Sequence, residues 1–163
     1  MMMRWLVYTM MALLLSTQAW ADMRIGFVST DRVMREAPIA LAAQKRLEKE
    51  FAPRDAALQK LAKQVKDAQM LLDREGMTLS DSDRHNKERD LANLNLEYQR
   101  SLREFREDLN LRRNEELVKV QDRARKAIQA YAESEKYDLI VEDAVYYNPR
   151  IDITDRIIRM LAQ

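Results

Sequence analysis

Apolar residues recur with helical spacing along most of the chain. Between residues 38 and 75 they occupy the a and d positions of a heptad repeat, separated mostly by charged residues, Gln and Ala. Pro38 suits the first turn of a helix, and Pro53 is expected to kink or break it. Gly76 should end the helix in a left-handed conformation. The stripe consists of Leu47, Phe51, Leu58, Leu61, Val65, Ala68 and Leu72.

A second helical pattern covers residues 82–134. Ser80 can cap it by accepting the N–H of Asp83. Spacings of eleven residues recur among its apolar positions, a period of about 3.67 residues per turn, so the left-handed supercoil should relax here. The helices would be about 57 and 80 Å long. The apolar positions are Leu91, Leu94, Tyr98, Leu102, Phe105, Leu109, Leu117, Val120, Ala124, Ile128 and Tyr131. We predict a long antiparallel helical-hairpin (coiled-coil) arm over residues 38–131, with its tip near 76–82.

The two ends of the mature chain have β-strand character. Residues 23–28 alternate apolar with small or polar side chains, and residues 137–142 and 144–147 are rich in β-branched and aromatic residues. Residues 29–31 are turn-like. Asp152 can cap a last helix, whose apolar face comprises Ile153, Ile157, Ile158 and Leu161.

Three short strands and one short helix form too small a unit to stay folded alone, and the chain has no cysteine to staple it. We therefore predict a discontinuous β-rich oligomerisation body, residues 22–37 plus 132–163, with strands from several chains closing one core. The fold class is mainly α with a small β part. The candidates for the shared core are Ile25, Phe27, Leu139, Val141, Val145, Tyr147, Ile157 and Leu161.

Residues 1–21 have the pattern of a signal peptide. Arg4 precedes an apolar run of about 11 residues, too short to span a membrane, and Ala19-Trp20-Ala21 offers small residues for cleavage after Ala21. Nothing later is apolar enough to span a bilayer. We therefore expect a soluble mature protein exported across the inner membrane to the periplasm.

Composition argues against several function classes. The chain has 28 Lys+Arg and 27 Asp+Glu, so losing Arg4 leaves 27 of each, which disfavours a nucleic-acid binder. With no Cys and one His, the common zinc sites are excluded. The sequence contains no Gly-rich phosphate loop, no Cys nucleophile and no His partner for a serine. We predict a protein that is not an enzyme and needs no cofactor or metal.

Four short motifs stand out, together with the strand-like residues 25–28 near the start: residues 112–116 (RRNEE), 137–141 (YDLIV), 144–148 (AVYYN) and 152–155 (DITD). With these residues the mature chain resembles the Skp/OmpH family of periplasmic chaperones, the "seventeen-kilodalton protein" type. The resemblance implies a homotrimer with a small β-barrel body and three helical tentacles around a cavity. It also implies that the protein holds unfolded outer-membrane β-barrel proteins without ATP and aids their delivery to the outer membrane.

Charge distinguishes this chain from the basic tentacles common in the family. Residues 73–90 carry six acidic and four basic side chains, and the positive excess lies between residues 100 and 126. The neutral balance argues against electrostatic capture at the tip. Peripheral contact with the membrane or with lipopolysaccharide stays an open alternative.

Client contact is expected at apolar residues off the heptad stripe, because stripe residues pack within the hairpin. Methionine suits promiscuous apolar contact since it is flexible and polarisable. The candidates are Met70, Leu71, Met77, Leu79, Leu96 and Leu111. The alternative function is a structural coiled-coil envelope protein that binds no client.

Overall fold

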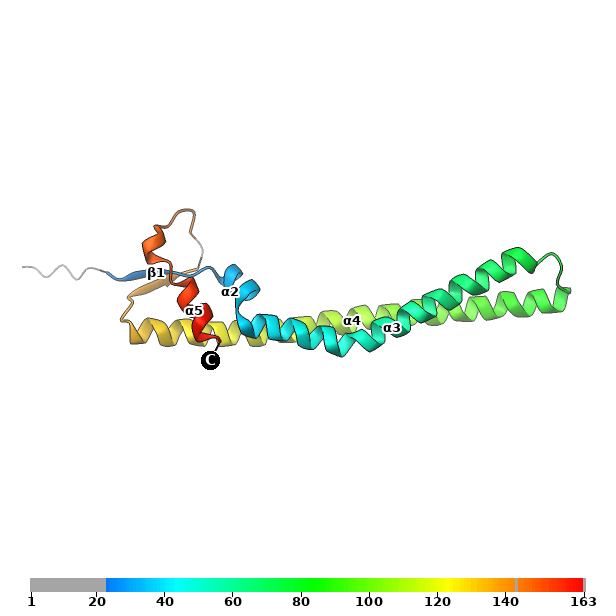
Figure 1. The fold of residues 1–163 in the computed structure, drawn as a ribbon, viewed down its shortest axis with the longest axis horizontal. Coiled ribbons are helices and arrows are strands. Elements are labelled where there is room, and N and C mark those ends of the chain that lie inside the picture. Colours follow the sequence, from blue (N-terminus) through cyan, green and yellow to red (C-terminus); the bar gives the residue numbers. More distant parts are fainter. Residues whose placement is uncertain (1–22, 143, 163) are drawn as a thin grey trace, which may run out of the picture.

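The computed structural model describes residues 23–142 and 144–162. The chain is mainly helical, with a small body at one end and a long two-helix arm (Figure 1). In chain order the elements are β1 (Ile25–Phe27), α2 (Thr30–Glu36), α3 (Pro38–Glu75), α4 (Asp81–Ser134), β2 (Leu139–Val141), the 3-10 helix η1 (Pro149–Ile151) and α5 (Thr154–Met160).

Helices α3 and α4 lie side by side and make up the arm (Figure 1). Their cross-helix partners, Arg46 with Glu116 and Arg54 with Asp108, follow opposite orders, so the two helices run in opposite directions. The Ser80 side chain accepts the N–H of Asp83 at 3.1 Å and caps α4, as the sequence predicts. Both helices begin and end within one or two residues of the predicted bounds.

The sequence-based expectations for α3 concern Pro53 and Gly76. Of the kink or break expected at Pro53, the break is absent because α3 is continuous through this residue, and Figure 1 shows that the helix axis bends part-way along. Gly76 has φ −57° and ψ −30°, so the left-handed prediction is wrong. Glycine is favoured there for a different reason, because a Cβ would collide with the carbonyl oxygen of Leu72.

The chain turns back at the end of α4, where Lys136 adopts a φ of 55°. This brings β2 beside β1 in a parallel pair, with Ile25 opposite Leu139 and Phe27 opposite Val141. Phe27 also bridges to Asp152, which places the C-terminal segment on the other edge of β1. The sheet therefore gathers residues from both ends of the described chain.

The predicted strand 144–147 is wrong for the single chain, in which these residues form no strand. Val145 and Tyr146 are exposed, whereas the Tyr147 ring stacks on Phe27 with centroids 3.7 Å apart. Strand residues need a neighbouring strand, and among the described residues none lies beside them. The sequence analysis also expected only a turn at residues 29–31, where Ser29 instead caps helix α2 by accepting the N–H of Arg32.

The body has a hydrophobic core of its own. Helix α2 and the end of α4 contribute to it, so it draws on more of the chain than the short terminal strands and last helix. The predicted apolar face of the last helix is confirmed, with Ile157 fully buried, and Asp152 accepts the N–H of Thr154 at 2.8 Å. The buried members are Val28, Val33, Ala37, Ala124, Tyr131, Ile153, Ile157 and Leu161.

Candidate functional site

The seam between α3 and α4 is only partly closed. Along α3 only Ala43 and Phe51 are buried, and the predicted seam residues farther out keep part of their surface accessible. Two helices alone cannot enclose a seam, because each side chain is covered from one direction only. An open groove of about 390 Å³ results, lined in part by Leu58, Leu61 and Phe105. The half-buried seam residues are Leu58, Leu61, Val65, Leu94, Tyr98 and Phe105.

Four of the six predicted client-contact residues are well exposed: Met70, Met77, Leu96 and Leu111, with Met77 at 97%. Leu71 and Leu79 are partly buried. The six residues do not converge on one pocket. They are distributed from the tip toward the body, an arrangement suited to many separate weak contacts.

Sequence reasoning missed three exposed apolar residues near the body, namely Leu41, Leu117 and Val118. Val118 lies seven residues after Leu111, so both side chains project from the same face of α4. That seven-residue spacing was the available signal. The exposed apolar surface therefore extends along the arm and is not confined to its tip.

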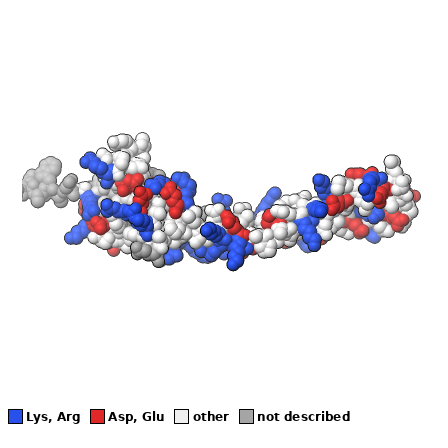
Figure 2. Space-filling model, in the orientation of Figure 1, with Lys and Arg blue, Asp and Glu red and all other residues white. Residues whose placement is uncertain are grey.

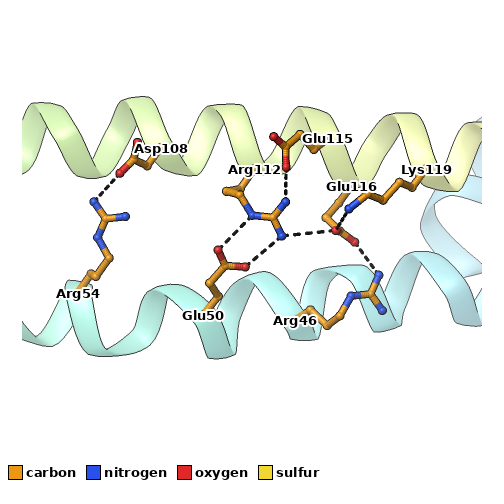
Figure 3. A network of polar contacts seen from close by, with 8 residues as sticks. All are labelled: Arg46, Glu50, Arg54, Asp108, Arg112, Glu115, Glu116 and Lys119. Carbon is orange, nitrogen blue, oxygen red and sulfur yellow. Dashed lines mark hydrogen bonds and ion pairs between the residues drawn. The ribbon is translucent and has the colours of Figure 1, made fainter.

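A polar cluster joins the two helices at the body end of the arm (Figure 3). The side chain of Glu116 is only 6% exposed, and its carboxylate accepts hydrogen bonds from Arg46 at 2.6 Å and from Lys119 at 2.9 Å. Arg112 lies 3.6 Å from Glu116 and donates to Glu50 on α3 at 3.1 Å. The cluster thus satisfies a buried carboxylate with cations from both helices.

The hydrogen bonds from Arg46 and then Lys119 lower the pKa of Glu116 from 4.5 to about 2. The hydrogen bond from Arg112 likewise lowers the pKa of Glu50 below its usual value. Arg112 and Glu116 belong to the motif at residues 112–116 on which the family resemblance rests. Their pairing across helices could not be inferred because it depends on the register between α3 and α4.

Positive side chains gather along the middle of the arm, whereas both signs mix at its tip (Figure 2). Among the described residues, several basic side chains of α4 form no ion pair. These are Arg103, Arg106, Arg113, Arg123, Arg125 and Lys126. The middle of the arm therefore keeps a local positive field on a chain with little net charge.

The sequence profile described as "Outer membrane protein (OmpH-like)" matches residues 24–161. The chain belongs to the OmpH-like family. This confirms the resemblance found in the sequence.

Relatives in the OmpH-like family carry the name "Chaperone protein Skp". The Photorhabdus luminescens protein is 30% identical over 138 residues, which cover 84% of each chain. The Yersinia enterocolitica protein is 28% identical over 163 residues, covering 98% of this chain and 99% of that one. An OmpH-like outer membrane chaperone of solved structure, from Caulobacter crescentus, has a TM-score of 0.74 at 18% identity and covers 86% of this chain and 84% of that one. The relatives' names agree with the prediction that this OmpH-like chain is not an enzyme.

In this OmpH-like chain the predicted shared-core residues fall into three groups: buried, exposed and partly buried. Phe27, Ile157 and Leu161 are buried within the single chain. Ile25 and Leu139 are 37% and 47% exposed and lie opposite each other across the sheet, so their side chains share one face. Val145 is exposed as well, whereas Val141 and Tyr147 are partly buried. The exposed group forms apolar surface on the body.

Within residues 23–142 and 144–162, no group of three or more His, Cys, Asp or Glu side chains could hold a metal ion. Over the same residues, no helix combines the length and apolar character needed to cross a membrane. The predicted signal peptide, residues 1–21, lies outside the described part of the chain.

Proposed function

We propose that this protein is an ATP-independent periplasmic holdase chaperone that binds unfolded outer-membrane β-barrel proteins and prevents their aggregation. The observation that carries the proposal is the apolar surface left open along the arm, from Met77 at the tip to Val118 near the body. A surface of this kind suits extended clients with many apolar side chains. The name shared by the Skp relatives supports the same function.

The working form is a homotrimer. Residues 22–37 and 132–163 of three copies form a β-barrel body, and residues 38–131 form three arms around a cavity. The exposed apolar residues Ile25, Leu139 and Val145 support this assembly, because a second copy would remove them from water. The strand-like residues 144–147, which pair with no strand in the single chain, would gain a partner in the same way.

The protein reaches the periplasm through a signal peptide that is removed after Ala21. Peripheral contact with lipopolysaccharide or the membrane is a secondary proposal, supported by the basic side chains of α4 that form no ion pair with another described residue. Outer-membrane clients would be shielded until their delivery to the outer membrane.

Client holding depends on apolar contact more than on charge. Each exposed apolar residue contributes a weak contact, and every contact after the first is effectively intramolecular, so avidity accumulates along the arm. The near-neutral chain provides little long-range attraction, which salt would screen beyond about 8 Å.

The test is a dilution assay without nucleotide. A urea-unfolded outer-membrane barrel protein is diluted into buffer with the purified protein, and aggregation is followed by light scattering. We expect suppression at equal trimer and client concentrations, unchanged by added ATP. A coiled-coil spacer, the alternative function, would leave aggregation unchanged and would bind no dye specific for exposed apolar surface.

A further inference from the structure

The polar contacts between α3 and α4 are confined to the end of the arm near the body. Among the described residues, the hydrogen bonds and ion pairs that cross between the two helices involve Arg46, Glu50 and Arg54 of α3. Their partners on α4 lie between Asp108 and Glu116. From residue 55 outward to the tip, no such contact links the helices in the described part of the chain.

Packing follows the same division. Phe51 is buried and meets Phe105 edge-to-face, with ring centroids 5.6 Å apart. The guanidinium of Arg54 lies 5.3 Å from the Phe51 ring and 5.9 Å from the Phe105 ring, so it covers this pair. Farther out, α3 has no buried residue and α4 has only Leu91. The outer arm is therefore held by partial apolar burial alone.

The sequence accounts for this weakness. Apolar residues of α3 repeat every seven positions, whereas spacings of eleven recur in α4, so the two stripes wind differently about their helices and pack less completely along the outer arm. Figure 1 shows α3 passing from one side of α4 to the other along the arm. Pro53 adds a weak point in α3, because it has no N–H to donate within the helix.

We propose that the cluster of Arg46, Glu50, Arg112 and Glu116, with the Arg54–Asp108 pair, is a lock that keeps α3 and α4 closed near the body while the helices separate transiently beyond it. Separation exposes the outer seam side chains to solvent. The lock fixes how far toward the body the opening runs. This inference concerns the arm itself and does not depend on the identity of any client.

Hydrogen exchange of the full processed protein tests the proposal, because a helix parted from its neighbour loses most of its stability and exchanges its amides. We expect amides in residues 57–72 and 94–104 to exchange at least tenfold faster than those in 44–51 and 112–124. Glu116→Gln removes the central charge with little change in shape. It should speed exchange at least tenfold in residues 44–51 and 112–120.

Glu97→Gln is the matched control, because Glu97 is another α4 glutamate and forms no ion pair among the described residues. This control should leave the exchange rates of residues 44–51 and 112–124, at the end of the arm near the body, unchanged. The proposal would be overturned if amide protection were uniform along the arm. It would also be overturned if Glu116→Gln left amide protection near the body unchanged. Circular dichroism verifies that both variants keep their helical content.

An independent measurement uses the absence of natural cysteines. Leu61→Cys and Ser101→Cys, which line the same groove, can be joined by a short bis-maleimide cross-linker. The cross-link should slow amide exchange in residues 57–72 to the rate seen near the body, in residues 44–51 and 112–124. Exchange in those residues near the body should stay unchanged. Outer-arm exchange as fast with the cross-link as without it would contradict helix separation.

Discussion

The body and the arm bury their apolar residues in different ways. The body encloses Val28, Val33 and Ile157 almost completely, although it is small and its sheet has only two strands in the single chain. The arm contains far more residues, yet most of its seam side chains stay half-exposed. The body core is surrounded by α2, α4, α5 and the strands, whereas the arm consists of two helices only. A side chain is therefore buried more completely where more elements surround it. The difference assigns stability to the body and adaptable surface to the arm.

The largest effect is expected from removing the C-terminal part of the body. A chain lacking residues 137–163 loses β2 and α5, and with them half of the sheet and three core residues. Assembly should be abolished, while much of the helical circular dichroism signal persists because α3 and α4 are retained. Light scattering measures the mass. An intact trimer after the deletion, or a monomeric full-length protein at micromolar concentration, would contradict the assignment of assembly and stability to the body.

A single core substitution should cost less than the deletion but far more than a change at an exposed position of the arm. Ile157→Ala removes a side chain that is 0% exposed and leaves a cavity, at a cost of about 4 kcal/mol in the free energy of unfolding. Leu96→Ala is the control, since Leu96 is 71% exposed and its loss should cost under about 0.5 kcal/mol. Urea unfolding measures both. Equal costs would mean that the arm is packed as tightly as the body.

The arm surface should govern client affinity. Changing Met70, Leu71, Met77 and Leu79 together to Ser should weaken client binding more than changing Arg100, Arg103 and Arg106 to Gln, because contact is mainly apolar. Raising salt from about 0.05 to 0.5 M should alter the Kd by less than tenfold, or about 1.4 kcal/mol. Fluorescence titration with an unfolded outer-membrane protein provides the Kd. If salt changed the Kd a hundredfold, or if the arginine variant bound the client more weakly than the Ser variant, electrostatic capture would govern client binding.

A further effect, confined to low pH, concerns the ionisation of the polar cluster. The pKa of Glu116 is about 2 in the folded chain and 4.5 ordinarily, so its ionised form stabilises the fold above pH 4.5 and that contribution is lost as pH falls through 2. The hydrogen bond from Arg112 lowers the pKa of Glu50, so Glu50 also contributes stability that is lost in acid.

Because Arg46 and Lys119 are largely exposed and screened, we expect a loss of about 2 kcal/mol between pH 5 and 2. Glu116→Gln should remove most of this loss, and thermal melts along a pH series measure it. Glu97→Gln, which lacks an ion partner among the described residues, should retain the full pH dependence. Parallel pH curves for the wild-type chain and Glu116→Gln would show that the cluster contributes no stability.

The elements with a strong period were predictable from sequence. Apolar spacing, the proline in the first turn of α3 and the Ser80 cap of α4 predict both long helices closely. The residue types of 144–147 favour a strand, but a strand exists only where a partner strand lies, and sequence propensity contains no information about partners. The Glu116 cluster was missed for a related reason, since its members come from two helices whose register depends on the whole seam. Exposure of Met77 and Leu96 was expected because they lie off the stripe.

The ring stack between Phe27 and Tyr147 has a consequence for the entropy of association. Residues 144–147 are tethered at one end by β2 and at the other by this stack, with the Asn148 side chain accepting the N–H of Arg150 just beyond. Ordering a free segment of four residues costs roughly 1–2 kcal/mol per residue. A segment already held at both ends has lost part of that freedom before any strand meets it. In the proposed trimer, Val145 and Tyr146 would thus meet a neighbouring chain as a preorganised apolar segment.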